Sequence, residues 1–302
     1  MHKSVLLNEC IEYLNIKEDS IIVDCTLGYG GHSSEILKKI PKGHLYSFDQ
    51  DENAIKYSNE RLSKISSNYT IIESNFVNIK QKLNEILNDK VDGILYDLGV
   101  SSPQLDIGER GFSFHQDAIL DMRMNQKQEL NAAYVVNEYS YERLIDIFFR
   151  YGEEKYAKNI AKAIINKRPI KTTMELVDVI REAVPFKYSR EKHPARKIFQ
   201  AIRIEVNNEL EVFEKSLKDA LNLLNIGGRI CVITFHSLED KICKKIFKEV
   251  SSIGSEFNNL PVIPIEYQPN FKIIKTIEPS KEELEVNQRA RSAKLRVIER
   301  VK

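Results

Sequence analysis

The sequence predicts an α/β fold with an all-helical segment inserted into it, and three observations lead to this prediction. Residues 1–105 alternate apolar strand patterns with helical patterns, as the chain of a parallel sheet does. Residues 106–204 show no convincing strand and carry apolar residues at three- and four-residue spacing. The alternation then resumes over residues 205–302. We therefore expect an α/β core made of 1–105 and 205–302, interrupted by a helical domain at 106–204.

The individual elements follow from the same patterns. Short β-branched and apolar runs predict strands near 21–25, 44–48, 69–73, 91–97 and 227–236, with closing strands within 261–277 and at 294–300. Apolar residues at helical spacing predict helices at 129–150, 153–167, 173–184 and 194–210 in the inserted segment, and at 209–224 and 241–250 in the core.

Composition limits the class of protein. The 302 residues are 42% hydrophobic and 29% charged, as in ordinary globular proteins. No apolar run approaches the roughly 18 residues of a membrane span, and the first residues lack the apolar core of a signal peptide. The four cysteines are scattered without a C-x-x-C pair, which favours reduced thiols over disulfides or a zinc site. We expect a cytoplasmic protein without a metal.

Charge is unevenly distributed although the net charge is only +1. Residues 1–100 hold 11 basic against 15 acidic residues, a balance of −4, so the remaining residues carry +5. Two stretches, 187–203 and 287–302, each contain six basic residues and one acid. Such stretches indicate a polyanionic partner, nucleic acid above all, or else two solvated helix faces.

The most informative segment is 21–33, where an apolar strand ends in Asp24 and a glycine-rich turn leads into a helix. Such a turn brings backbone N–H groups and a helix start to the carboxyl edge of a sheet. The glycines are spaced G-x-G-G and not G-x-G-x-x-G, so the dinucleotide fingerprint is missing. A strand-end carboxylate suits a cationic group better than a pyrophosphate. The pattern is similar to the first motif of S-adenosylmethionine-dependent methyltransferases; a turn without a ligand is the alternative.

A second acid supports a nucleoside ligand. Asp49 ends the second predicted strand, 25 residues after Asp24, near the offset at which a carboxylate meets ribose hydroxyls. NAD and S-adenosylmethionine both carry that ribose, so Asp49 does not separate them. Its alternative role is to cap the next helix, for which Asp51 is the other candidate.

The loop after the fourth strand indicates the reaction. It runs from Asp97 through Ser102, Pro103 and Gln104 to Asp106. Ser102-Pro103-Gln104 is a weakened form of the loop in methyltransferases that act on exocyclic amines, where a rigid turn holds acceptors for the amine hydrogens. Methylation at carbon 5 of a pyrimidine requires a cysteine nucleophile, and no cysteine occupies such a loop. An ordinary turn is the alternative reading.

Several motifs in order make the chain similar to a known family. They include 26–33, 97–106, 110–114, 121–124, 151–154, 199–207, 235–240 and 287–296, together with His2 and residues 5–9. With these motifs the chain resembles the bacterial 16S ribosomal RNA cytosine-N4 methyltransferase family, the RsmH/MraW type, over nearly its whole length.

The resemblance implies a Rossmann-like S-adenosylmethionine methyltransferase sheet with an inserted helical, substrate-binding domain. It implies methyl transfer from S-adenosylmethionine to N4 of a decoding-centre cytidine in 16S rRNA, within the small ribosomal subunit and away from membranes. The oligomeric state stays open, a homodimer included. Carried onto matching positions, the cofactor contacts are Gly30, Gly31, His32, Asp49, Phe76, Asp97 and Gln104.

Each implied residue has a physical role. The glycines allow a close approach of the backbone, and His32 is placed to donate to the cofactor carboxylate. Phe76 is placed against adenine, while Asp97 and Gln104 lie near the amino-acid or methyl end. For catalysis we expect Asp97, Ser102 and Pro103 to orient the amine.

Two further questions remain open. His236, at the end of the fifth strand, is either catalytic or a helix cap. The chain as a whole is an RNA methyltransferase, an NAD-linked oxidoreductase, or a non-catalytic RNA-binding or assembly factor with a vestigial cofactor site. The glycine spacing argues against the oxidoreductase, and the retained acids Asp24, Asp49 and Asp97 argue against the vestigial site.

Overall fold

The computed structural model describes residues 4–87, 89–101, 104, 108–191, 193–253, 264 and 267–302. The chain divides into two units. One consists of Met1–Gly99 and Leu210–Lys302, and the other of Val100–Glu209. Among the described parts of the chain, none of the helices combines the length and the apolar character that a bilayer crossing requires.

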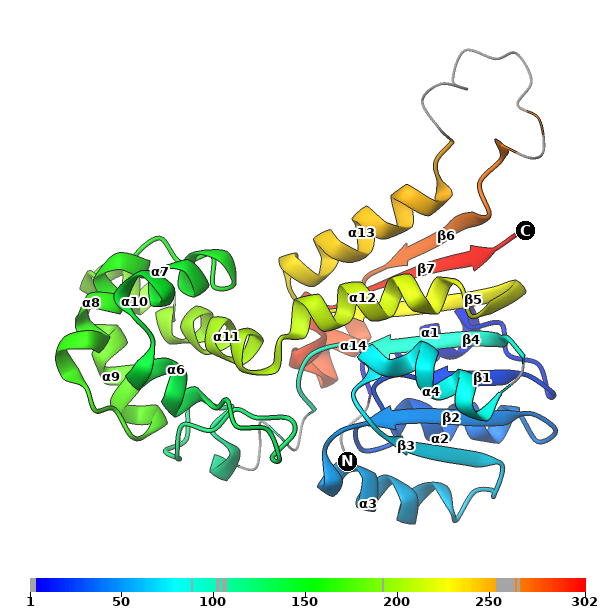
Figure 1. The fold of residues 1–302 in the computed structure, drawn as a ribbon, viewed down its shortest axis with the longest axis horizontal. Coiled ribbons are helices and arrows are strands. Elements are labelled where there is room, and N and C mark those ends of the chain that lie inside the picture. Colours follow the sequence, from blue (N-terminus) through cyan, green and yellow to red (C-terminus); the bar gives the residue numbers. More distant parts are fainter. Residues whose placement is uncertain are drawn as a thin grey trace. The chain divides into compact units, whose positions relative to one another are not determined.

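The first unit is built on a seven-stranded sheet with the order β3-β2-β1-β4-β5-β7-β6 (Figure 1). The neighbours among β1 to β5 pair parallel, whereas β7 pairs antiparallel with both β5 and β6. The predicted α/β class and the strand positions are confirmed, and the sheet is mixed rather than purely parallel. The strands are β1 (Ile21–Asp24), β2 (His44–Asp49), β3 (Tyr69–Glu73), β4 (Val91–Asp97), β5 (Leu224–Thr234), β6 (Phe271–Ile277) and β7 (Lys294–Arg300).

Helices cover both faces of this sheet, which explains why its strands read as nearly continuous apolar runs. Adjacent strand residues point to opposite faces: Ile22 belongs to one apolar cluster and Val23 to the other. The Ile22 face is covered by α1 (Leu7–Tyr13), α2 (Gly31–Lys39) and α3 (Glu52–Leu62). The Val23 face is covered by α4 (Ile79–Ile86), α12 (Glu209–Leu221) and α13 (Ser237–Ser251).

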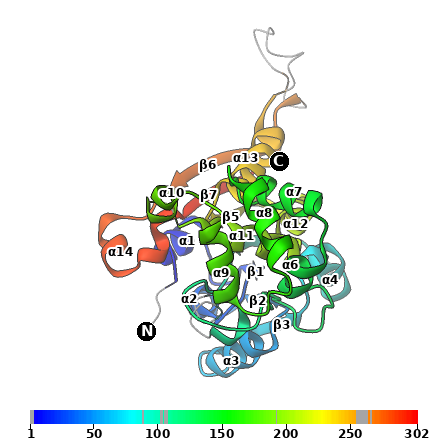
Figure 2. The ribbon, with the colours of Figure 1, turned by 90° about the vertical axis from the view of Figure 1, so that its left-hand side faces the viewer.

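Segments from the two ends of the sequence meet in the first unit. Figures 1 and 2 both show α1 beside α14 (Lys281–Val286). The backbone N–H of Leu6 donates a 2.8 Å hydrogen bond to the Glu283 carboxylate. Short 3-10 turns complete the unit at η1 (Phe76–Asn78) and η5 (Gln288–Ser292).

The second unit is helical and has an apolar core of its own. Its central helix, α11, contacts α6, α7 and α9 (Figure 2). The single helix predicted over 129–150 is wrong, because the chain breaks at Tyr139 and Ser140. The Ser140 hydroxyl accepts from Arg143 N and caps the next helix. The elements are η2 (Gly108–Arg110), α6 (Ala132–Glu138), α7 (Tyr141–Arg150), α8 (Ala157–Lys167), α9 (Thr173–Glu182), α10 (Phe186–Glu191) and α11 (Pro194–Asn207).

Candidate functional site

The candidate site lies at the carboxyl ends of the parallel strands. The strand order reverses between β1 and β4, because the chain builds β1, β2 and β3 outward in one direction and then continues with β4 and β5 in the other. Open α/β sheets bind ligands at this reversal point. Here Asp24 ends β1 and Asp97 ends β4.

The glycine-rich turn after β1 has a backbone that only glycine adopts easily. Gly28 and Gly30 have φ values of 49° and 72°, and Gly30 is the N-cap residue of α2. The Ser58 hydroxyl donates to the Gly28 carbonyl at 2.7 Å, and Gly28 N donates to Asp49 at 2.8 Å. The turn is therefore held in place from α3 and from the end of β2.

Asp24 organises the turn from inside. Its side chain is buried, and its oxygens accept from Thr26 N at 3.0 Å and from the Ser33 hydroxyl at 2.7 Å. Burial raises the pKa of Asp24, while the bonds from Ser33 and Thr26 act against the rise. The Asp24 carboxylate, which the sequence predicts to face a cationic ligand group, thus already accepts hydrogen bonds from its own turn and from α2.

Asp49 is also engaged by backbone donors. Its carboxylate accepts from Gly28 N at 2.8 Å, Gln50 N at 2.8 Å and Asp51 N at 2.9 Å. Burial raises the pKa of Asp49 to about 6, although these bonds oppose the rise. A carboxylate has about four acceptor positions, so about one is left for a ribose hydroxyl. The helix cap is Asp51, which accepts from Asn53 N and begins α3.

Asp97 has the most unusual environment of the three acids. Its Oδ1 atom is buried and has no hydrogen-bond partner among the described residues, whereas the side chain as a whole is 26% exposed. Burial first, and then the negative charges of Asp24 and Glu239, raise the pKa of Asp97 to about 8. Because an unpaired buried oxygen is costly, this atom marks a place where a ligand donor would be stabilised.

His32 stands beside Asp97 with a defined tautomer. Its Nε2 lies 3.1 Å from the Val5 carbonyl oxygen, and its Nδ1 lies 3.5 Å from Asp97 Oδ2. Burial lowers the pKa of His32 to about 4, so the ring is neutral and its one N–H points to Val5. Donation to a cofactor carboxylate, the role expected for His32, would require the ring to turn or to gain a proton.

The first turn of α13, which follows β5, contributes a further buried acid. Glu239 is 3% exposed and accepts from Phe235 N at 2.7 Å. His236 is the N-cap residue of α13 and forms a capping box with Glu239, so its structural role is the helix cap. We did not single out Glu239 or Thr26 from the sequence. The His-x-x-Glu spacing before an apolar run is the signal that indicates Glu239.

The remaining predicted residues are distributed differently. Phe76 begins η1 and is half-buried. Its ring is edge-on to that of Tyr96, with 5.6 Å between the ring centroids. Gln104 belongs to the helical unit, where its side-chain oxygen accepts from Ser101 N at 3.0 Å. Ser102 and Pro103 lie outside the described residues.

Many cations of the two basic stretches have internal partners. In 187–203, Arg203 pairs with Glu209 at 2.8 Å, and Lys197 donates to the Glu153 carbonyl at 2.8 Å. In 287–302, Arg296 pairs with Asp240 at 2.6 Å. Arg196 is exposed, and no ion pair is found for it among the residues that the structure describes.

Comparison with known proteins gives the family. The profile of the MraW methylase family matches residues 1–301. "Ribosomal RNA small subunit methyltransferase H" of Exiguobacterium sibiricum is 53% identical over 307 residues, covering 100% of this chain and 98% of the relative. Its counterpart in Limosilactobacillus fermentum is 54% identical over 309 residues, with the same coverage. A solved rRNA methylase from Streptococcus thermophilus aligns over 100% of this chain and 99% of its own, at 12% identity and a TM-score of 0.43. On the family match over residues 1–301 and the two relatives at 53% and 54% identity, the chain belongs to the MraW methylase family.

Proposed function

We propose that this chain transfers a methyl group from S-adenosylmethionine to the N4 amine of a decoding-centre cytidine in 16S rRNA of the small ribosomal subunit. Membership of a methylase family makes the chain a methyltransferase. The relatives named above are ribosomal RNA small subunit methyltransferases, which supports the substrate. We place the activity in the cytoplasm, where small subunits are available.

The observation that carries the choice of cofactor is the unpaired Asp97 oxygen at the strand reversal. Asp97 lies under the negative influence of Asp24 and Glu239, so the site favours a ligand that brings positive charge. S-adenosylmethionine carries a sulfonium and an ammonium group, whereas the pyrophosphate of NAD would add negative charge at this point. The acidic groups around Asp97 therefore fit S-adenosylmethionine better than NAD.

The remaining cofactor contacts that we propose are supported by the geometry of the turn or by the family resemblance. Gly30 and Gly31 would allow the methionine part to approach the backbone. The one acceptor position left on Asp49 would take a single ribose hydroxyl, unless a backbone donor gives way. Phe76 and Gln104 stay predicted contacts, to adenine and to the amino-acid or methyl end.

The bound cofactor supplies an activated methyl group; the protein has to position the amine. The N4 lone pair is delocalised into the base, so acceptors for its hydrogens favour a more nucleophilic nitrogen. We assign this task to Asp97, Ser102 and the Pro103 turn. The base must leave its stack to reach them, and close placement supplies much of the rate. We further propose that the helical unit, Val100–Glu209, binds the RNA.

The test is transfer of labelled methyl groups into small subunits that lack the modification, followed by mapping of the modified nucleotide. The proposal expects label on N4 of one decoding-centre cytidine. Label on carbon 5, or a covalent RNA adduct on a cysteine, would overturn the mechanism. Subunit binding without methyl incorporation would instead support an assembly factor. Calorimetry with S-adenosylmethionine and with NAD tests the oxidoreductase alternative, which requires binding of NAD.

A further inference from the structure

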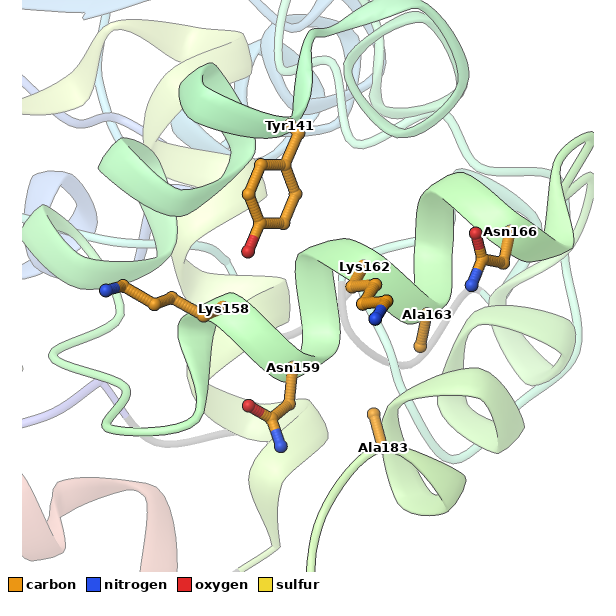
Figure 3. A pocket seen from close by; sticks show the side chains of 7 residues that line it. All are labelled: Tyr141, Lys158, Asn159, Lys162, Ala163, Asn166 and Ala183. Carbon is orange, nitrogen blue, oxygen red and sulfur yellow. The ribbon is translucent and has the colours of Figure 1, made fainter.

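The helical unit has a surface hollow of about 380 Å³ beside α8. In Figure 3 most of the labelled side chains lie along α8, with Tyr141 of α7 on one side of that helix and Ala183, at the end of α9, on the other. None of these residues belongs to the site at the strand ends or to the two basic stretches. The lining consists of Tyr141, Lys158, Asn159, Lys162, Ala163, Asn166 and Ala183.

The polar groups of this hollow are suited to an anion. Lys158 and Lys162 offer ammonium donors, and Asn159, Asn166 and Tyr141 offer neutral N–H and O–H donors. No carboxylate is among the described residues that line the hollow. A ligand with several negatively charged oxygens would therefore find donors without repulsion.

The two lysines carry charge that the fold leaves uncompensated. Both are exposed, and no ion pair is found for either one among the residues with described positions. They are four residues apart on one helix face, where like charges repel each other and destabilise the helix. Lys158 also stands in the first turn of α8, which has no acidic residue there and no side-chain cap, so the helix dipole disfavours it. An anion would relieve both effects.

We propose that this hollow binds backbone phosphates of the RNA substrate, an inference that rests on the proposed function. The lining residues at 158, 162 and 166 form a row about 12 Å long at 1.5 Å per residue. A row of this length fits consecutive phosphates of a nucleic-acid strand better than one small anion. Amide and phenol donors beside the cations are typical of contacts to phosphate and sugar oxygens.

The test compares two double variants that remove the same charge at the same spacing. Lys158→Gln with Lys162→Gln alters the hollow. Lys244→Gln with Lys248→Gln is the control, because these lysines are also exposed and four apart, on α13 of the other unit. Glutamine keeps the helix propensity of lysine. Binding to small subunits that lack the modification is measured between 50 and 200 mM salt.

Each phosphate contact to a single strand contributes about 0.7 to the slope of log K against log salt, so two lost contacts lower the slope by about 1.4. As salt rises fourfold from 50 to 200 mM, the ratio of the wild-type affinity to that of the hollow variant, Lys158→Gln with Lys162→Gln, should then fall about sevenfold. The control variant should keep the wild-type slope. A hollow variant whose slope equals that of the wild type overturns the inference.

Two further readouts keep the interpretation sharp. Affinity for S-adenosylmethionine should be the same in the wild type and in both double variants. If the wild-type protein neither binds nor methylates the subunits, the proposed function is refuted, and not only this inference. All four native cysteines are buried, so Lys162→Cys gives one accessible thiol for a photo-activated cross-linker. Cross-links to rRNA support the inference, whereas cross-links confined to a ribosomal protein would contradict it.

Discussion

Replacing Asp97 by asparagine should stabilise the ligand-free protein, by an amount that grows with pH. In the folded protein the pKa of Asp97 is raised to about 8, mainly by burial, from an ordinary value of 3.8. Between these two values the unfolded chain has released its proton while the folded protein still holds it. Stability contributed by the protonated group is therefore complete below about pH 4 and is lost as the pH rises to about 8.

The magnitude follows from the linkage relation. Each pH unit in this window costs the wild type about 1.4 kcal/mol relative to a side chain that does not titrate. The stability difference between Asp97→Asn and wild type should widen by about 2 kcal/mol from pH 6 to pH 8 and level off above pH 8. This figure is an upper limit, because the carboxyl group is 26% exposed.

The assay is denaturant unfolding of both proteins without ligand at several pH values. Titrating groups that do not interact with Asp97 act equally on the two proteins and cancel in the difference, whereas Asp24 and Glu239 interact with it directly. Asp49→Asn provides the comparison, since the pKa of Asp49 is raised only to about 6 and its difference curve should level off near that pH. A difference between Asp97→Asn and wild type that does not change between pH 6 and pH 8 would refute the account of Asp97 as a carboxyl group with one buried oxygen that has no hydrogen-bond partner among the described residues.

Four other outcomes are expected. Affinity for S-adenosylmethionine, measured by calorimetry, should rise with pH up to about 8 in the wild type but not in Asp97→Asn, because a cationic ligand prefers the ionised carboxylate. Asp49→Ala should weaken the affinity for S-adenosylmethionine about ten- to a hundredfold, because it removes a charge-assisted hydrogen bond. Unchanged affinity in a folded variant would exclude Asp49 from the site. Arg196→Gln should lower the salt slope of subunit binding by about 0.7, whereas Arg296→Gln should lower the denaturation midpoint because it breaks the ion pair with Asp240; the reverse pattern would contradict the assignment. Methyl transfer should persist in a folded variant in which alanine or serine replaces all four cysteines, Cys10, Cys25, Cys231 and Cys243. Loss of methyl transfer in that variant would support a mechanism with a cysteine nucleophile.

The sequence predicts the strands well, because a strand buried on both faces is written as a local apolar run. It does not predict that β7 inserts between β5 and β6, since that order depends on antiparallel pairing between distant segments. The single helix predicted over 129–150 missed the break before α7. There the deciding signal is local, because Ser140 is a strong N-cap residue within an otherwise helical pattern.

In the candidate site, too, the sequence predicts some features and only the fold shows the others. Asp24 and Asp97 are both strand-end acids in the sequence, and both are natural candidates for a cationic ligand. Only the fold distinguishes them, since the Ser33 hydroxyl satisfies Asp24 while an oxygen of Asp97 is left without a donor. The orientation of His32 is equally inaccessible to sequence reasoning, because a carbonyl 27 residues away, that of Val5, fixes its tautomer.

The position of β4 in the sheet has a consequence for synthesis on the ribosome. β4 pairs with β1 on one side and with β5 on the other, yet the whole helical unit is translated between β4 and β5. Until β5 emerges, the strand that ends in Asp97 has an open edge of unpaired backbone groups, a surface prone to wrong pairing between nascent chains. The helical unit is continuous in sequence and has its own core, so it can fold during this interval. The candidate site at the strand ends is thus among the last parts of the protein to form.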